Sequence, residues 1–452
     1  MKKSITNISL LLAISFSANA ADLSEIFTQS ELHDPQLSAA KYTLEASAEG
    51  RKQAFSAFLP QITGGWSKSQ GDDEFSSSLS EGSISSESDS RGWNLSLSQS
   101  LYNHANYENY KISELQILKS TADFDSAYQD FVLRVAQSYF NVLGANDSLI
   151  FSKAEEKAIQ RQLDQAEQRY EVGLAAITDV HEARARFDGA RASVILAKNQ
   201  LEDANEALFE ISQKYYPQLS PVPNNLNYSS FQLKPMESYQ EKGLKQSPEL
   251  ISSQISSDIA EKQISVNKAG HFPTLSLSLS KRNSFRPGTT TTQINPITGE
   301  FEPFESGDQT TDSNSISISL SVPIYSGGRT SSQVRQSAHQ HSAAMDRYEQ
   351  IRRGTVRKVR NAYHGTLAAV SSVEARKQAM ISAQSGLEAT EAGYEVGTRT
   401  IVDVLNSQRS LYQAQRDYSK AKYDYFIQYL DLQRSTGNLS EKDITTINNM
   451  LE

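Results

Sequence analysis

Apolar residues alternate strictly with serine in three stretches of the chain, Leu95–Leu97, Leu275–Leu279 and Ile316–Leu320. A period of two residues places the apolar side chains on one face of a β-strand and the serines on the other. The pattern therefore predicts two strand hairpins, at about residues 61–101 and 274–324. Each strand is expected to have about ten residues, the length that spans an outer membrane when tilted.

Aromatic residues and polar segments flank these predicted strands. The aromatic residues near the strand ends are Trp66, Trp93, Tyr102 and Tyr325. They are typical of the girdle that a membrane barrel places at the lipid interface. Residues 70–91 and 286–312 are rich in Ser, Thr, Gly, Asp and Glu, and we expect them to be long exposed loops. A soluble β-sandwich would show the same alternation, so that alternative stays open.

Two longer segments, 103–213 and 327–434, have a helical pattern. They are rich in Ala, Gln, Glu, Arg and Leu, with apolar residues three and four positions apart. No proline interrupts either segment, and proline is what breaks helix interiors. The composition, with many small residues on the apolar seam, predicts long coiled-coil helices that pack closely.

These segments are too long to be single straight helices. A helix of 110 residues would extend about 165 Å. We therefore expect a break near Gly144–Ser148 and another near Gly365–Ser371. A second irregular point follows at Gly173 and at Gly397, where glycine suits a helix C-cap. Thr178 or Thr400 is the expected N-cap of the helix that comes next, which makes both points tight turns at the tips of helical hairpins.

The second half of the chain repeats the first. Tyr170–Gly173 recurs as Tyr394–Gly397, and Ile177–Val180 recurs as Ile401–Val404 with an Asp in the same place. The pattern predicts an internal duplication, with copies at 21–234 and 235–437. Each copy is expected to hold helices, a strand hairpin and long helices. A proline-rich linker at 215–234 joins the copies, and the polar tail 438–452 is expected to lie along the surface or to be disordered.

The chain begins with the features of a secretory signal peptide. A positive start, a short apolar run and Ala18-Asn19-Ala20 predict cleavage of residues 1–20. The absence of cysteine excludes disulfides and cysteine-based zinc sites. A net charge of −9 argues against a nucleic-acid partner. After the leader no apolar stretch is long enough for a membrane helix.

The number of strands limits how they can sit in a membrane. Four amphipathic strands are too few to close a barrel, since the smallest single-chain barrels have about eight. An open sheet edge in lipid is prohibitive because its backbone groups have no partners. Several chains would therefore have to share one barrel, with the serine face lining a water-filled lumen that the long helices extend. The strand count therefore favours an oligomeric export conduit.

No pattern of catalytic chemistry is present in the sequence. His339 and His341 are two residues apart on a predicted helix and do not share a face, so a metal site there is not expected. His181 is followed by Glu182 but lacks the second histidine of a zinc protease motif. The sequence also has no phosphate loop, serine elbow or nucleotide fingerprint. We expect no enzyme activity, no cofactor and no metal.

Several motifs, read in order, resemble the TolC-type outer-membrane channels. The motifs are Phe58-Leu59-Pro60, Tyr139–Leu143, Arg161–Gln165, Val172–Leu174, Ala176–Val180, Val322–Tyr325 and Val396–Leu405. The resemblance covers nearly the whole chain after residue 20. It implies a mixed α and β fold, a homotrimer with a 12-stranded transmembrane β-barrel of four strands per chain. The barrel would continue into a long α-helical coiled-coil tunnel in the periplasm.

The resemblance also implies a function and partners. The chain would be the passive outer-membrane exit duct of tripartite efflux pumps, with a part in multidrug resistance, and of type I secretion. A periplasmic adaptor (membrane fusion) protein and an inner-membrane pump of the RND, MFS or ABC type would open it at its periplasmic end. Outer-membrane lipid would surround the barrel. The alternative is a periplasmic coiled-coil scaffold or binding protein without a pore.

Individual residues take roles by the same resemblance. The residues that match the gate are Thr178, Asp179, Gln162, Glu391, Tyr394 and Arg399. Tyr394 would contact Asp179 within one chain, Arg399 would reach Thr178 and Asp179 of the neighbouring chain, and Gln162 and Glu391 would form a further link. Asp403 would form an acidic constriction ring. Asn406 replaces a second aspartate that some members carry, and Gly173 and Gly397 would offer grooves for adaptor docking.

Overall fold

A computed structural model of the chain describes residues 20–76, 83–223, 233–288, 290–294, 297–299 and 301–451. Residues 1–19 of the expected signal peptide lie outside this range. The chain divides into two compact units. We call Thr43–Thr121 with Ser252–Glu349 the strand unit. The helical unit holds the chain up to Tyr42, Ala122–Ile251 and the chain from Gln350 onward.

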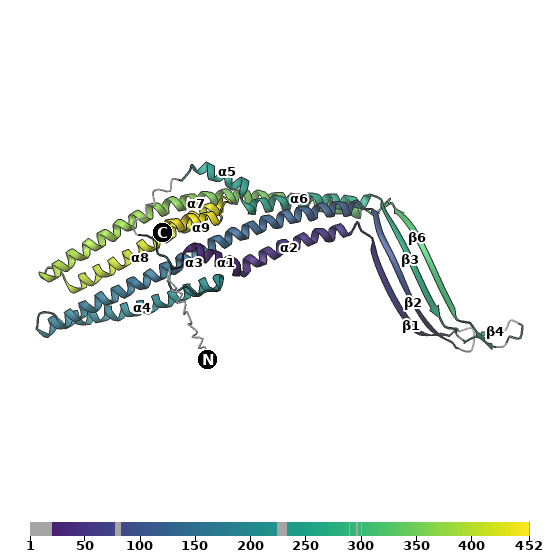
Figure 1. Cartoon of the computed structure of the whole chain (residues 1–452), viewed down its shortest axis with the longest axis horizontal. Helices are drawn as coiled ribbons and strands as arrows, with labels where there is room; N and C mark the ends of the chain where they lie inside the picture. Colours follow the sequence, from purple (N-terminus) through teal and green to yellow (C-terminus); the bar gives the residue numbers. More distant parts are fainter. Residues whose placement is uncertain are drawn as a thin grey trace, which may run out of the picture. The chain divides into compact units, whose positions relative to one another are not determined.

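The strand unit contains a four-stranded antiparallel sheet in the part of the chain that is described (Figure 1). Its order is β1 (Gln61–Ser76), β2 (Ser83–Tyr102), β3 (Thr274–Arg286) and β6 (Gln309–Ser321). One rung joins Ile62, Leu97, Leu279 and Ile316, and the next rung joins Thr63, Ser96, Ser280 and Ser315. The predicted alternation is therefore confirmed: the sheet has an apolar face and a serine face, named here for these two rungs.

The strands are longer than the expected ten residues. β1 has 16 residues, β2 has 20, and β3 and β6 have 13 each. Only part of each strand carries apolar residues, for example Trp93–Tyr102 in β2, and the backbone ladder continues past that part into polar sequence. Most of the expected loop 70–91 is thus strand, because ladder hydrogen bonds depend on the backbone and tolerate Ser and Asp side chains.

The second expected loop, 286–312, also contains strands. β4 (Thr290–Ile294) pairs with β5 (Phe301–Glu305) in a separate antiparallel hairpin. The prediction of an irregular loop was wrong here because threonine, which is β-branched, favours extended backbone even in a polar segment.

The remaining elements are helices. They are α1 (Leu23–His33), α2 (Pro35–Ser56), α3 (His104–Glu171), α4 (Ile177–Ser212), α5 (Met236–Gln246), α6 (Pro248–Lys268), α7 (Arg329–Glu395), α8 (Ile401–Ser435) and α9 (Glu441–Leu451). None of the helices within the described residues is both long and apolar enough to cross a membrane.

The expected helix breaks near Gly144 and Gly365 do not occur. α3 and α7 run through these glycines for 68 and 67 residues. A side chain at Gly144 would place its Cβ 3.5 Å from the Tyr423 ring, and one at Gly365 would lie 2.5 Å from Gln428 Oε1. Glycine costs about 1 kcal/mol in a helix interior, but it does not end either helix here, and both glycines lie where α8 packs against α3 and α7.

Aromatic residues form the core of the helical unit. Phe140 and Phe426 stack with ring centroids 5.2 Å apart, and both are fully buried. Tyr139 is buried beside them and donates a hydrogen bond to Ser220 O at 2.6 Å. This bond attaches the first residues of the expected linker to α3. Residues 224–232 of that linker lie outside the described range.

The polar tail is an ordered helix rather than a disordered segment. In α9 the side chains of Ile444, Ile447 and Leu451 are buried. Asn448 donates to Asp22 Oδ2 at 3.1 Å, and Asp22 itself caps α1. The disordered alternative was wrong because the apolar residues recur every three or four positions, a helical period that the overall polarity of the tail conceals.

Candidate functional site

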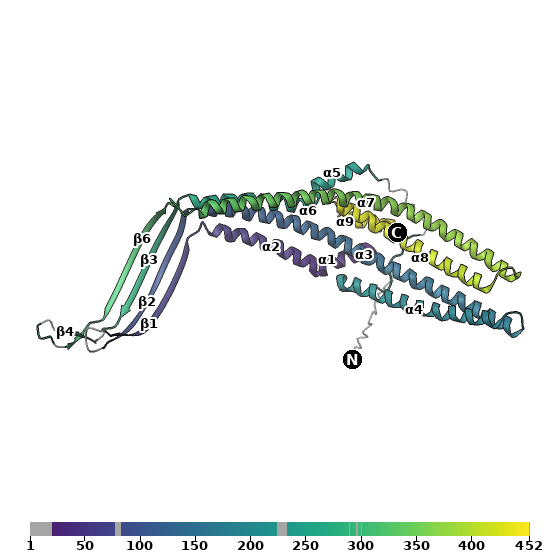
Figure 2. The ribbon, with the colours of Figure 1, turned by 180° about the vertical axis from the view of Figure 1, so that it is seen from behind.

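Two tight turns at one end of the helical unit form the candidate site (Figures 1 and 2). In the first turn Leu174 N donates to Arg169 O at 2.8 Å and Gly173 N donates to Tyr170 O at 2.9 Å. Gly173 has φ +77°. These two bonds and the left-handed glycine are the Schellman ending of a helix. The expected C-cap role of Gly173 is confirmed.

The second turn repeats this geometry. Thr398 N donates to Gly393 O at 2.8 Å, Gly397 N donates to Tyr394 O at 3.1 Å, and Gly397 has φ +79°. No heavy atom would lie within 4 Å of a Cβ at either turn glycine. The backbone angle, and not lack of space, is therefore what requires glycine at both turns.

The helices that follow the two turns begin differently. At α8, Thr400 Oγ1 accepts from Asp403 N at 3.2 Å while Asp403 Oδ2 accepts from Thr400 N at 2.9 Å, which is a capping box. At α4 the N-cap is Ala176, which makes no side-chain cap. Thr400 is thus confirmed as an N-cap. Thr178 is not one, because α4 begins at Ile177 and Thr178 lies inside its first turn.

The capping box fixes the charge of Asp403. Its carboxylate accepts hydrogen bonds from both the backbone and the hydroxyl of Thr400, the latter at 2.8 Å. These bonds lower the pKa of Asp403 below its ordinary value, and the charge of Arg399 acts in the same direction. Asp403 therefore stays ionised well into the acidic range.

Asp179 occupies the position in α4 that Asp403 occupies in α8. Because Ala176 replaces the threonine, Asp179 has no capping partner. Within the part of the chain that is described, neither Asp179 nor Thr178 has a side-chain hydrogen bond or ion pair. Thr178 is exposed and Asp179 is half-buried. Both side chains are thus available to a group from outside this chain.

Tyr394 links the two hairpins through a cation rather than through Asp179. The Arg169 guanidinium lies 4.8 Å from the centre of the Tyr394 ring. Below it, Leu163, Val180 and Ile401 belong to one buried apolar cluster that the Tyr394 ring also contacts. Arg169 was not identified from the sequence, since nothing in its neighbourhood marks it as different from other surface arginines.

Arg399 projects from the second turn. Its side chain is exposed, and among the residues that the structure describes it forms no ion pair or hydrogen bond. A Cβ at Gly393 would lie 2.8 Å from Arg399 Cγ, so Gly393 leaves the space in which the arginine stem lies. The contact that the resemblance assigns to Arg399 is one to a neighbouring chain, and this geometry leaves its guanidinium open for it.

Gln162 and Glu391 form no hydrogen bond with each other in the part of the chain that is described. Glu391 Oε1 accepts from Gln408 Nε2 at 3.4 Å. Gln162 Oε1 is buried and accepts no hydrogen bond from any described residue.

Asn406 contacts the first hairpin. Its Oδ1 accepts from Arg186 Nη2 at 3.5 Å, and Arg186 also pairs with Glu182 at 3.0 Å. Arg186 thereby joins α4 to α8, a contact that the sequence did not reveal.

The two turns also expose apolar side chains. Val172, Leu174 and Val396 are between 69% and 75% exposed. Exposed aliphatic residues on a rigid turn, next to glycines that permit close backbone approach, provide a surface to which another protein can bind.

The site and the fold together define a class of protein. The family model for the outer membrane efflux proteins matches residues 27–212 and 241–438. The chain belongs to this family.

Known relatives fit this assignment. The chain is 36% identical to outer membrane protein TolC of Vibrio cholerae serotype O1, over 95% of this chain and 93% of that protein. It is 26% identical to the alkaline protease secretion protein AprF of Pseudomonas aeruginosa, over 92% of this chain and 84% of that one. The CmeC outer membrane channel of Campylobacter jejuni has a similar fold, with a TM-score of 0.74 at 17% identity, covering 100% of this chain and 97% of that chain.

Proposed function

We propose that the chain forms a homotrimeric channel in the outer membrane and serves as a passive exit duct for efflux and for type I secretion. The observation that carries this proposal is the four-stranded sheet with one apolar and one serine face. Its edge strands are β1 and β6. In lipid these edges need partners, and three chains would join them into one barrel of 12 strands.

The dimensions of the sheet support a membrane location. The apolar part of β2 runs from Trp93 to Tyr102, and a tilted strand of about ten residues crosses an outer membrane. Trp66 and Trp93 face each other across the β1–β2 pair. They lie near the end of the apolar part of the strands, two positions from Lys68 and Arg91, as an interfacial girdle does.

An internal duplication would place two hairpins of each chain in the tunnel wall. α3 and α7 have 68 and 67 residues, and α4 and α8 have 36 and 35. This agreement supports copies at 21–234 and 235–437. The signal peptide 1–20 would direct export, and the helical unit would form the periplasmic tunnel.

The gate would lie at the two turns. Arg399 of one chain would meet Thr178 and Asp179 of the next chain. Arg399 and Thr178 are exposed, Asp179 is half-buried, and none of the three side chains has a hydrogen bond or ion pair to a described residue, which supports this. Tyr394 would brace the turn, with Gln162 and Glu391 forming a further link. Exposed ion pairs contribute about 0.2–1 kcal/mol each, so such a gate would hold closed and yet yield to a binding partner.

Asp403 would form the constriction ring, with three carboxylates per trimer and a neutral Asn406 beside each. Cations would be attracted and anions repelled. A periplasmic adaptor protein would dock at Gly173 and Gly397, against Val172, Leu174 and Val396, and an inner-membrane pump would supply the cargo. The name of the relative AprF refers to protease secretion, which supports a part in type I secretion; the family name supports efflux.

The proposal is tested with purified mature protein. A trimer that survives an unheated gel and dissociates on boiling, together with discrete conductance steps in a planar bilayer, is expected. A soluble periplasmic protein that gives no conductance would favour the poreless scaffold instead.

A further inference from the structure

A hollow on the serine face is positively charged. Its volume is about 500 Å³ and it lies over β1, β2, β3 and β6 of the strand unit. The rung at its centre consists of Ser67, Gly92, Ser284 and Thr311. Gly92 has no room for a side chain, because a Cβ there would lie 2.5 Å from Asn283 O. The centre of the hollow is therefore lined by small polar groups.

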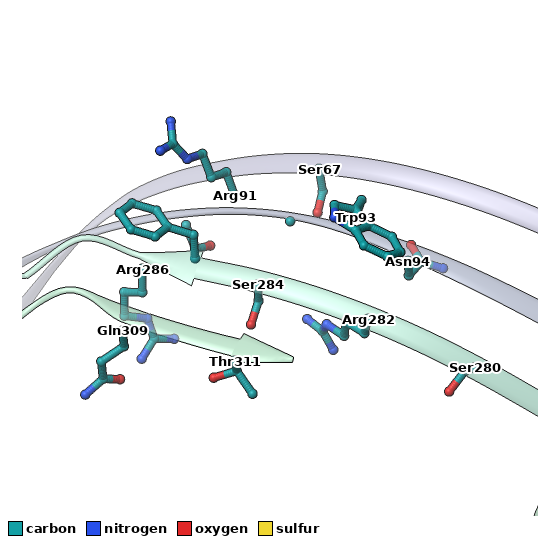
Figure 3. A pocket seen from close by; sticks show the side chains of 13 residues that line it. Ser67, Arg91, Trp93, Asn94, Ser280, Arg282, Ser284, Arg286, Gln309 and Thr311 are labelled. Atoms are coloured by element: carbon teal, nitrogen blue, oxygen red, sulfur yellow. The ribbon is translucent and has the colours of Figure 1, made fainter. Parts of the chain in front are cut away.

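Arginines border this rung on both sides. Arg282 is on the rung of Asn94 and Ser313, and Arg286 is opposite Gln309. Figure 3 shows Arg282 and Arg286 on the same side of the sheet as Ser284 and Thr311, with Arg91 on the opposite side. The two arginines are four positions apart in β3, which is about 13 Å along a strand. Two such flexible side chains can converge on the small rung between them.

No other charge occurs on this face in the rungs from Gln61 to Ser69 and along their partner strands. The remaining side chains of the serine face from Gln61 to Ser69 and along its partner strands are Ser, Thr, Asn and Gln. The nearby acids are occupied elsewhere. Asp312 accepts from Asn283 at 2.6 Å on the apolar face, Asp89 lies 4.0 Å from Lys68 on that same face, and Asp308 accepts from Gly288 N at 2.8 Å.

Both guanidinium groups consequently lack a counter-charge. Neither Arg282 nor Arg286 forms an ion pair or a hydrogen bond with any residue that the structure describes. A guanidinium presents a planar set of N–H donors that matches the oxygens of phosphate or carboxylate. Hydroxyl and amide donors surround the hollow, and the structure places no carboxylate on the rungs that form it.

We propose that Arg282 and Arg286 form a binding site for oxyanions, of the size and charge of inorganic phosphate. The binding site itself requires only the sheet of one chain. Its functional meaning rests on the proposed trimer, where the serine face would line the lumen and six arginines would surround it. The barrel would then favour anions, in contrast to the acidic ring assigned to Asp403, and anionic cargo groups would pause there.

Tryptophan fluorescence gives a readout that does not depend on conductance. Trp66 and Trp93 are the two tryptophans of the chain, and Trp93 lies in β2 between Gly92 and Asn94, which border the hollow. The folded protein is titrated with inorganic phosphate, with chloride adjusted to keep the ionic strength constant. A saturable change is expected for the wild-type chain. In Arg282→Gln/Arg286→Gln the apparent affinity should fall at least about tenfold, since each lost charged hydrogen bond is large.

The matched control removes two positive charges from the apolar face, one on β2 and one on β3. Arg91→Gln/Lys281→Gln should keep the wild-type affinity for phosphate. Should either double variant fail to assemble, the single variants Arg282→Gln and Arg286→Gln are expected to show intermediate losses. The same variants are then compared in a planar bilayer, where phosphate should block the wild-type current in 0.1 M KCl and block it less in 1 M KCl, because salt screens the site.

The outcomes separate this site from the proposed function. Equal phosphate titrations of the wild-type and arginine-free chains, or no saturable change in either, would overturn the anion site even if all variants conduct. Phosphate binding that depends on the two arginines would establish the site, whether or not the protein conducts. A lack of conductance would refute only the proposed channel.

Discussion

Thr400 and Asp403 cap helix α8 reciprocally, with Thr400 N donating to Asp403 Oδ2 at 2.9 Å and Asp403 N donating to Thr400 Oγ1 at 3.2 Å. The equivalent pair at α4 is Ala176 and Asp179, which lacks the hydroxyl. The difference between Ala176 and Thr400 thus commits one aspartate to its own chain and leaves the other available to a neighbour.

Thr400→Ala should make the proposed selectivity ring more sensitive to acid. The wild-type hydrogen bonds lower the pKa of Asp403. Its charge, with any stability that the charge contributes, therefore persists below the ordinary carboxyl pKa. Both are lost as the pH falls through the lowered pKa. In the variant the pKa rises, and cation selectivity should disappear at a higher pH. Reversal potentials between pH 7 and pH 3 measure this, with Thr445→Ala on α9 as a control. Identical pH profiles would show that the capping box does not tune Asp403.

Asn406→Asp should increase cation selectivity. The added carboxylate is three residues from Asp403, on the same face of α8, and would double the acidic charge of the ring in a trimer. Arg186, which contacts Asn406 at 3.5 Å, would offset part of this charge. Reversal potentials in a KCl gradient measure the change. Asn449→Asp, exposed on α9, adds the same charge outside the turns and should leave them unchanged. Equal potentials for the wild type and Asn406→Asp would contradict the assignment of the ring.

Gly397→Ala should loosen the second turn. The residue has φ +79°, which costs a side chain about 1–2 kcal/mol. Amide hydrogen exchange across 396–400 should accelerate, and adaptor docking should weaken. Gly386→Ala is the matched control, because Gly386 is inside α7 with no atom within 4 Å of an added Cβ, and alanine there should be neutral or stabilising. Unchanged exchange in Gly397→Ala would mean that the turn can relax to accept a side chain.

Ile447→Ala should destabilise the docked C-terminal helix. Ile447 is fully buried, and truncation of such a side chain costs about 2–5 kcal/mol. The opening free energy of α9, measured by hydrogen exchange, should fall by that amount. Thr446→Ala, on the exposed side of α9, should change it by less than about 0.5 kcal/mol. Similar values for the two variants would indicate that α9 does not pack against the helical unit in solution.

The strand pattern and the turns could be read from the sequence because local physics determines them. Alternating leucine and serine at 275–280 fixes which face each residue takes, and the structure confirms it. Gly173 and Gly397 end their helices in the left-handed conformation, as expected. In both cases the backbone requirement is visible in a few neighbouring residues.

Other features depend on contacts between distant parts of the chain. Gly144 looks like a helix breaker until Tyr423 is placed beside it. α9 is held by contacts with the start of α1, including the hydrogen bond from Asn448 to Asp22. Arg169 is distinguished from other surface arginines only by its contact with the Tyr394 ring. The contacts of Arg399 and Asp179 to a neighbouring chain involve a partner that a single chain does not contain.

The proposed channel and its gate at Arg399 are best tested by conductance of the purified mature protein in a planar bilayer. The wild type is compared with Arg399→Ser and with Arg409→Ser, a control at an exposed position of α8. We expect small cation-favouring steps for the wild type and the control, and larger steps when Arg399 is removed. Steps that are the same size in all three proteins would contradict a gate held by Arg399, and a complete absence of steps from folded protein would contradict the channel itself.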